Sequence, residues 1–431
     1  MLRREVPLGE RLIGIGCYYT STKGVGGRLR RTPSDFSVEE ISTPPGENSG
    51  LCGSGVSFEL VKEGWDTHLL LERLARELKV PLDWINISGT KDKRAVTRQR
   101  VTIRGVTPEE VAKLSIPGIR VENPKWCSRR TWLGEHTGNR FKVKITEISL
   151  SMDEAEQLVL ETLLATGGII PNFFGHQRFG SVRPNTHRVG WYLLRGDIKG
   201  AVHAYLGDPQ PWEPGDARRA RTIFDETHDY AHALEVFPRR LVYERRMLAY
   251  LRDHPGDYVG ALRRLPRLLV KMFVHAYQSF LFNRMLTERI IRGFPLTEPI
   301  LGDILVRRGE MIRVTKYNLR FAGEYVGRGW VVTHPLVGCD VPLAEGEPGM
   351  IEREVLEGEN VELEWFNNVP VLNETFRGVR RVVYAPHWDT RILGVGEDDS
   401  GVWVDLSFVL PRGAYGTVLL REIMKCGIEN Y

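Results

Sequence analysis

The sequence is poor in cysteine. Its 431 residues include five cysteines, which lie far apart and form no Cys-x-x-Cys pair. An odd number of scattered cysteines excludes a disulfide framework, and the missing pairs exclude the usual cysteine-based zinc site. We therefore expect a protein without a bound metal.

The chain also lacks a long apolar segment. No apolar run approaches the roughly 20 residues that cross a bilayer. The residues after Met1 lack the apolar stretch and cleavage site of a secretory signal. At 42% hydrophobic and 26% charged residues, the composition is that of a globular protein. These features predict a soluble cytoplasmic protein that does not associate with a membrane.

Net charge is low as well, at +4, but its distribution is uneven. Residues 1–31, 91–104 and 239–271 carry net charges of +5, +5 and +6, whereas residues 340–364 carry −8. Each run taken alone is compatible with a solvated surface segment. Together, the basic runs favour a positive face that binds a polyanion such as a nucleic acid.

Hydrophobic periodicity predicts a mixture of strands and helices. Residues 139–145 alternate most clearly, with apolar side chains between Arg140, Lys142 and Lys144. Such alternation predicts a strand with one core face and one basic face. Thr67 is a suitable N-cap for a helix whose leucines recur at helical spacing.

The organisation of the chain changes along its length. The stretch after residue 171 is rich in Arg, His, Pro and aromatic residues, and a composition like that of the first 170 residues returns near residue 378. Within this stretch, residues 268–292 predict one long amphipathic helix that ends at Gly293. Residues 402–410 predict a strand that precedes a terminal helix. The pattern indicates one domain inserted into another.

The segment 89–99 is the strongest candidate for chemistry. Asp92 is its only carboxylate and is surrounded by basic side chains, three of which are Lys91, Lys93 and Arg94. Cationic neighbours lower the pKa of a carboxyl group, so we expect an ionised Asp92 that serves as nucleophile or base beside a phosphate backbone. The alternative is structural: Asp92 caps a turn or pairs with a neighbouring cation.

The same segment, Gly-x-Lys-Asp-Lys-x-Ala-x-Thr-x-Gln, resembles the active-site motif of the TruD pseudouridine synthases. Further segments resemble the family in its order along the chain: residues 33–40 (with Ser34 in a Glu position), 133–141, 171–180, 378–381 and 406–422. One match would be weak, whereas six in order are difficult to obtain by chance.

The resemblance implies roles for individual residues. Asp92 matches the catalytic aspartate. Three positions match residues that contact the target uracil: Phe36, Asn139 and Tyr415. Arg30 resembles the basic residue that pairs with the aspartate, although its neighbour Arg31 is an alternative. Five basic residues are expected to bind RNA: Lys91, Lys93, Arg94, Arg140 and Lys142. Gly416 stands where many family members have Ala.

These roles are chemically consistent. Isomerising uridine to pseudouridine is redox-neutral, so we expect no cofactor. Extruding the base costs a few kcal/mol, and stacking on Phe36 and Tyr415 would return roughly 1–3 kcal/mol per base. Asn139 carries both a donor and an acceptor that can read the uracil edge. Without the resemblance, we would interpret Phe36 and Tyr415 as core residues and Asn139 as a residue that forms a turn. Asp92 could act by covalent addition or by forming a glycal.

The resemblance also implies a fold of the α/β (α+β) class. The expected catalytic domain comprises residues 1–170 and 377–431 around a mainly antiparallel sheet, with an inserted α+β TRUD domain at residues 171–376. The expected activity is that of a monomeric isomerase that acts on tRNA, usually at uridine 13. The alternative is a non-catalytic RNA-binding protein or tRNA chaperone of the same fold.

Overall fold

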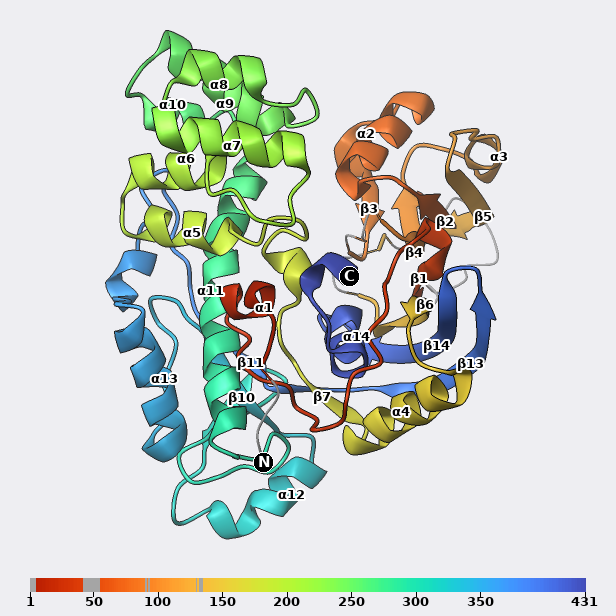
Figure 1. The fold of residues 1–431 in the computed structure, drawn as a ribbon, viewed down its shortest axis with the longest axis vertical. Helices are drawn as coiled ribbons and strands as arrows, with labels where there is room; N and C mark the ends of the chain where they lie inside the picture. The colour runs from red at the N-terminus through yellow and green to blue at the C-terminus, as the bar shows by residue number, and fades with distance from the viewer. Residues whose placement is uncertain (1–4, 42–54, 90, 92–93, 129, 132–134) are drawn as a thin grey trace. The chain divides into compact units, whose positions relative to one another are not determined.

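The computed structural model describes all residues except 1–4, 42–54, 90, 92–93, 129 and 132–134 (Figure 1). Contacts divide the chain into two compact units. Unit 1 comprises Met1–Ser21, Pro171–Tyr384 and Gly427–Glu429, and unit 2 comprises Thr22–Ile170, Ala385–Cys426 and Asn430–Tyr431. No helix in the described part of the chain has the length and apolar character needed to span a membrane.

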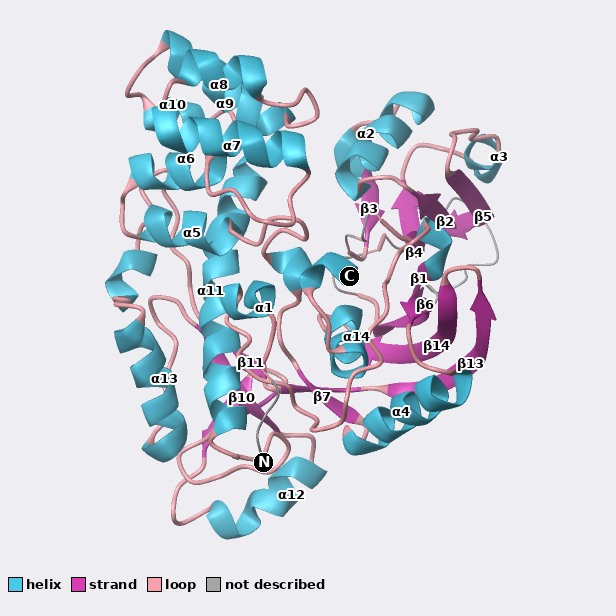
Figure 2. Cartoon of the chain, viewed as in Figure 1, coloured by secondary structure: helices cyan, strands magenta, loops and turns pink. Residues whose placement is uncertain are grey.

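Unit 2 is built on an eight-stranded sheet with the order β13-β14-β6-β1-β4-β2-β5, in which β3 also pairs with β4 (Figure 2). Its strands are β1 (Phe36–Ile41), β2 (Gly55–Glu63), β3 (Ile85–Ile87), β4 (Val96–Ile103), β5 (Ile119–Cys127), β6 (Gly138–Ile148), β13 (Trp388–Asp398) and β14 (Gly401–Pro411). β1 and β4 run parallel, and the other registers of this sheet are antiparallel. The expected mainly antiparallel sheet is confirmed.

The alternation predicted for residues 139–145 is present in β6. Phe141, Val143 and Ile145 are buried, whereas Lys142 on the other face is exposed. β1 and β14 flank this strand, so its apolar face contributes to a core that continues across three strands. The stacked rings of Phe141 and Phe408, 5.0 Å apart, are part of that core.

The helices of unit 2 follow from local sequence signals. They are α2 (Thr67–Leu78), α3 (Pro108–Ala112), α4 (Met152–Ala165) and α14 (Gly416–Met424), with short 3-10 turns η1 (Pro33–Asp35) and η2 (Leu82–Trp84). α4 begins with a capping box between Ser151 and Glu154, which satisfies amides at the helix start. α2 packs Leu70 and Leu74 against β2 and β4 in a continuous apolar cluster.

Unit 1 is mainly helical. Its helices are α1 (Leu8–Leu12), α5 (Thr186–Leu194), α6 (Ile198–Leu206), α7 (Gly215–Thr227), α8 (Tyr230–Val236), α9 (Val242–Asp253), α10 (Tyr258–Leu262), α11 (Arg267–Ile291), α12 (Ala322–Gly327) and α13 (Gly346–Gly358). Helix α11 confirms the long helix predicted at 268–292. Its Arg289 forms a fully buried pair with Asp303, at 2.7 Å.

A four-stranded sheet completes unit 1, in the order β11-β10-β8-β9. These strands are β8 (Ile304–Arg307), β9 (Glu310–Arg313), β10 (Val331–Leu336) and β11 (Val379–Val382). Two further short strands, β7 (Ile169–Pro171) and β12 (Tyr384–Pro386), pair with each other. The remaining 3-10 turns are η3 (His176–Arg178), η4 (Leu319–Phe321), η5 (Leu363–Phe366) and η6 (Ile428–Asn430).

Candidate active site

One face of the sheet of unit 2 carries buried polar side chains on three neighbouring strands. The registers pair Asn139 of β6 with Glu40 of β1, and Val38 of β1 with Thr97 of β4. Gln99 lies two residues beyond Thr97, so strand alternation places it on the same face. All four polar side chains belong to residues that are at most 9% exposed.

Several polar atoms at this position have no hydrogen-bond partner among the residues that the structure describes. They are Glu40 Oε1, Thr97 Oγ1, both amide atoms of Gln99, His136 Nδ1 and Asn139 Oδ1. We refer to these five residues as the polar cluster. A buried polar group left unsatisfied costs about 1–3 kcal/mol. Such a concentration of unsatisfied groups is typical of a site that binds a polar ligand.

Lys91 directly precedes Asp92 in the sequence and is anchored to unit 2 by both its backbone and its side chain. Its ammonium group lies 3.1 Å from Glu40 Oε2, and both side chains are buried. Its amide donates to Thr67 Oγ1 at 3.2 Å, and its carbonyl accepts from that hydroxyl at 3.1 Å. The buried Lys62 also donates to this carbonyl, at 3.4 Å. Asp92 itself lies outside the described residues.

The position of Thr67 in α2 corrects one prediction made from the sequence. Thr67 was expected to cap α2 but is instead its first helical residue. The capping acceptor is Asp66 Oδ1, which accepts from the Leu69 amide at 3.2 Å. Asp and Thr are both good N-caps, so the local sequence could not separate these neighbours. The hydroxyl of Thr67 bonds to the backbone of Lys91 instead.

His136 was not singled out by the sequence but lies next to this segment. A side chain at Gly89 would contact the His136 ring, with Cβ 3.5 Å from Cε1. Burial and the nearby positive charge of Lys91 lower the pKa of His136 below its usual value, against the opposing effect of Glu40. His136 is therefore neutral at neutral pH. Its position three residues before Asn139 was the only signal that the sequence offered.

Lowering the pH is expected to destabilise the folded protein through His136. The folded-state pKa is depressed relative to an unfolded value of about 6.5. The stability contributed by the neutral ring is therefore present above that value and is lost as the pH falls. We expect the melting temperature of His136→Gln to fall less than that of the wild type when the pH is lowered from about 7.5 to 5.5.

The matched control is His254→Gln, which changes an exposed histidine of unit 1. It should retain the wild-type difference in melting temperature between the two pH values. If His136→Gln also retained the full wild-type difference, the proposed titration of His136 would be incorrect.

Phe36 lies under an arginine on the same sheet face. The residue is 2% exposed, and its ring packs edge-on against Phe141 at 6.2 Å. The guanidinium carbon of Arg30 lies 4.1 Å from the Phe36 ring centroid. This is a favourable cation–π geometry. One face of the Phe36 ring is thus covered by Arg30 in this structure.

Arg31, the alternative to Arg30, makes different contacts. Its guanidinium donates to Ser400 Oγ at 2.6 Å and lies 3.6 Å from Asp398. Arg31 and Asp398 are both substantially exposed. Of the two arginines, Arg30 contacts Phe36, which the sequence predicts to bind uracil, whereas Arg31 forms an exposed ion pair with Asp398.

Tyr415 follows β14 and precedes α14. It is half-buried and occupies the N-cap position of the helix. β14 pairs Leu410 with Asn139, so Tyr415 and Asn139 lie at the same end of the sheet. The next residue, Gly416, faces Phe141, where an added Cβ would lie 2.7 Å from a ring carbon. An alanine at position 416 would require the Phe141 ring to move.

The basic residues expected to bind RNA occupy several environments. Lys91 is buried against Glu40, and Arg94 is exposed. Arg140 and Lys142 project from the face of β6 opposite Asn139, and Arg140 pairs with Asp389. A pocket of about 320 Å³ beside Arg140 is lined by Glu39, Glu40, Ile41, Glu59, Arg98, Gln99, Arg100 and Arg140. Lys93 lies outside the described residues.

Part of the basic run 239–271 serves the fold of unit 1. Arg245 donates to the carbonyls of Leu234 and Phe237, each at 2.6 Å. Arg240 forms an exposed ion pair with Asp216. The number of basic side chains in this run therefore overstates its capacity to bind a polyanion.

Comparison with known proteins identifies a family along nearly the whole chain. The family model for "tRNA pseudouridine synthase D (TruD)" matches residues 12–423. The chain is 38% identical to "Probable tRNA pseudouridine synthase D" of Methanococcoides burtonii over 98% of each protein, and 36% identical to that of Thermococcus onnurineus over 95% of this chain and 97% of the relative. A crystal structure of the TruD protein from Methanosarcina mazei matches 99% of this chain and 100% of its own, with 37% identity and a TM-score of 0.80.

Proposed function

The chain belongs to the TruD family of tRNA pseudouridine synthases, and on this premise we propose that it converts uridine 13 of tRNA to pseudouridine, with Asp92 as its catalytic carboxylate. The observation that carries the proposal is a group of buried polar atoms around Lys91, the residue before Asp92, that have no hydrogen-bond partner among the described residues. A flipped uracil supplies donors and acceptors that can satisfy such groups.

The reaction breaks the bond between the ribose C1′ and the uracil N1, rotates the base, and joins C1′ to C5. The proton at C5 is lost and N1 gains one, so electrons balance without an oxidant or reductant. Asp92 takes part either by adding covalently or by removing the proton at the 2′ carbon, and both routes need it ionised. We therefore propose that the protein uses neither a cofactor nor a metal.

We propose that the uracil enters above Phe36, in the position that Arg30 occupies in this structure. Stacking on the ring would replace the cation–π contact and release the guanidinium to pair with Asp92. Asn139 would read the uracil edge, and Tyr415 at the same end of the sheet would provide a second aromatic surface.

The surrounding RNA is proposed to contact Lys93 and Arg94, which follow Asp92 in the sequence. Lys91 would act by positioning this segment, because its ammonium group is already paired with Glu40. Arg140 and Lys142 lie on the opposite sheet face from Asn139 and would contact phosphates rather than the target base. In this proposal the enzyme acts on tRNA in the cytoplasm as a monomer.

Mapping of pseudouridines tests the proposal directly. An unmodified tRNA transcript incubated with the pure protein is expected to gain pseudouridine at position 13. A transcript with cytidine at that position should gain none there. If the protein binds the transcript but forms no pseudouridine at any position, the chain is an RNA-binding protein of the same fold that lacks catalysis.

A further inference from the structure

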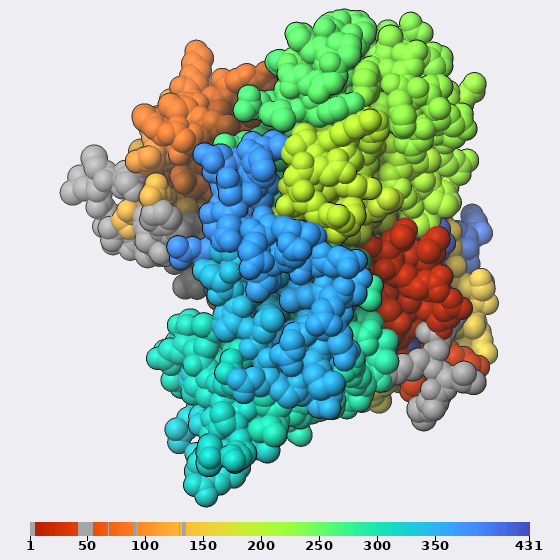
Figure 3. All heavy atoms as spheres, turned by 90° about the vertical axis from the view of Figure 1, so that its left-hand side faces the viewer, coloured from red at the N-terminus to blue at the C-terminus, as the bar shows by residue number. Residues whose placement is uncertain are grey.

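A separate basic surface lies in unit 1, outside all the charge runs considered above. Residues 304–331 contain six Lys or Arg residues against Glu310 and Glu324, a net charge of +4 that equals the formal charge of the whole chain. They form the β8–β9 hairpin, η4, α12 and the first residue of β10. Figure 3 shows this segment, coloured teal to cyan, at the molecular surface. We call it the basic hairpin segment.

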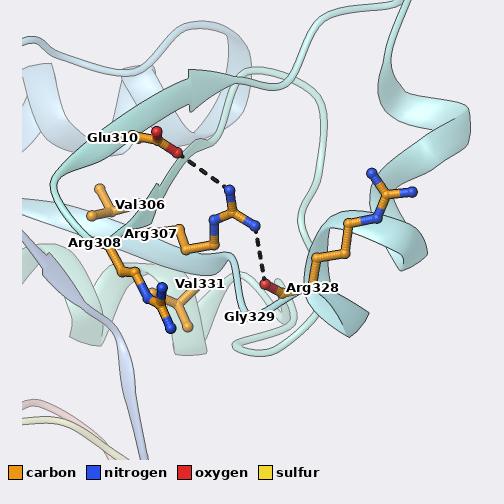
Figure 4. Close-up of a pocket in the computed structure, with 7 residues that line it drawn as sticks. All are labelled: Val306, Arg307, Arg308, Glu310, Arg328, Gly329 and Val331. Atoms are coloured by element: carbon orange, nitrogen blue, oxygen red, sulfur yellow. Dashed lines mark hydrogen bonds and ion pairs between the residues drawn. The ribbon is translucent and has the colours of Figure 1, made fainter.

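Three arginines of this segment surround a pocket of about 590 Å³, whose lining residues are Val306, Arg307, Arg308, Glu310, Arg328, Gly329 and Val331. Figure 4 shows the Arg307 guanidinium between Glu310 and the carbonyl of Arg328, to which it donates at 3.3 and 3.5 Å. Arg308 and Arg328 extend on either side of Arg307 (Figure 4). Arg307 is therefore held in place, and Arg308 and Arg328 line the same pocket.

Much of the positive charge here is not neutralised by the residues that the structure describes. Within the described chain, no carboxylate forms an ion pair with Arg308, Lys316 or Arg320. Arg328 lies 3.4 Å from Glu324, but both side chains are more than half exposed, so solvent screens the pair. A surface with this excess of positive charge favours the binding of an anion from solution.

The backbone conformation of Arg308 supports a functional role. Arg308 and Gly309 form the two-residue turn of the hairpin, with φ values of +49° and +89°. Turns with two positive φ values favour Gly, Asn or Asp, because a longer side chain is strained there. An arginine at the first position places a guanidinium at the tip of the hairpin despite this strain, which is a pattern associated with binding sites.

An exposed aromatic ring lies in the same segment. The Tyr317 side chain is 75% exposed, although hydrogen bonds of the next residue hold its loop. Asn318 accepts from the Thr315 amide at 2.7 Å and donates to the Arg313 carbonyl at 2.9 Å. The Lys316 ammonium lies 5.1 Å from the Tyr317 ring centroid. An exposed aromatic ring beside a cation is suited to stacking on an unpaired base.

We propose that the basic hairpin segment is a second RNA-binding site, which holds backbone phosphates of the tRNA with Arg307, Arg308 and Arg328 and stacks an unpaired base on Tyr317. The planar guanidinium group matches the oxygens of a phosphate with paired hydrogen bonds. This inference rests on the proposed function, because it takes tRNA as the substrate. It adds a binding surface that is remote in sequence from the polar cluster.

Binding of an unmodified tRNA transcript over a range of KCl concentrations tests this site. Arg308→Asn and Arg328→Ala are each expected to raise Kd by roughly fivefold and to lower the salt slope by about 0.7–0.9 for each phosphate that is no longer neutralised. Tyr317→Ala should raise Kd while leaving the slope unchanged, because it removes stacking and no charge. The matched control is Arg353→Ala, which removes an exposed arginine from the acidic helix α13 and should alter neither quantity.

Arg308→Asn also separates binding from folding. Asparagine tolerates a positive φ better than arginine, so this variant should melt at the same temperature as the wild type or higher while binding tRNA more weakly. Unchanged Kd and salt slope in both arginine variants would overturn the proposal. A change in self-association by sedimentation, with tRNA affinity unchanged, would also overturn it, because the partner would then be a second copy of the chain.

This test is independent of catalysis. A wild-type protein that binds tRNA but forms no pseudouridine would contradict the proposed function, and the binding data would still decide whether the basic hairpin segment contacts RNA. A protein that forms pseudouridine, with full affinity in all three site variants, would retain the proposed function and lose this inference.

Discussion

Replacing Asp92 with asparagine is expected to reduce the single-turnover rate of pseudouridine formation by roughly 10⁴-fold or more, as loss of a catalytic nucleophile does in other enzymes. The amide has nearly the shape of the carboxylate but can act neither as a nucleophile nor as a base. Binding of tRNA should be retained, because the change removes no contact to phosphate. Rate and affinity are measured separately, by single-turnover conversion and by equilibrium binding of the same transcript.

The control for this experiment is Asp83→Asn, which makes the same chemical change at an exposed position of unit 2. We expect it to convert uridine at the wild-type rate. If Asp92→Asn kept a tenth or more of the wild-type rate, the essential carboxylate would have to be another group. Glu40, which is buried against Lys91, would then be the first to examine.

Removing the charge of Glu40 is expected to have the second large effect, on stability. In Glu40→Gln the ammonium group of Lys91 would remain buried without its counterion. Breaking a buried pair in this way costs about 3–5 kcal/mol. Urea unfolding of the full chain, followed by circular dichroism, should show the corresponding decrease in the free energy of unfolding. Turnover should fall as well, because Lys91 precedes Asp92.

A double variant distinguishes the ion pair from other roles of Glu40. Glu40→Gln combined with Lys91→Met removes both charges, so it is expected to recover most of the lost stability. Its catalytic rate should stay low, because the anchor of the segment before Asp92 is absent in both variants. A double variant no more stable than Glu40→Gln would show that the cost does not arise from an uncompensated Lys91.

Much of the fold was predictable because its signals are local. The alternation in β6 and the long apolar stripe of α11 follow from side-chain spacing, and both are present in the structure. The family could also be inferred from short motifs, since each keeps its residues in sequence order.

The site was less accessible from the sequence. Its motif pointed to Asp92, but the partners of that segment come from distant parts of the chain: Glu40, Thr67 and His136. Strand pairing brings Glu40 beside Asn139, and no periodicity in the sequence encodes which strands become neighbours. Likewise, the sequence could not choose between Arg30 and Arg31, whereas their contacts are distinct in the structure.

The sequence by itself determined the family, the alternating faces of the strands and the candidate catalytic carboxylate, because these depend on residue type and on spacing within a few turns or strands. Only the tertiary structure decided which buried polar groups share a sheet face, which threonine contact holds Lys91, and where unneutralised arginines gather. Those properties depend on pairing between segments that are tens to hundreds of residues apart.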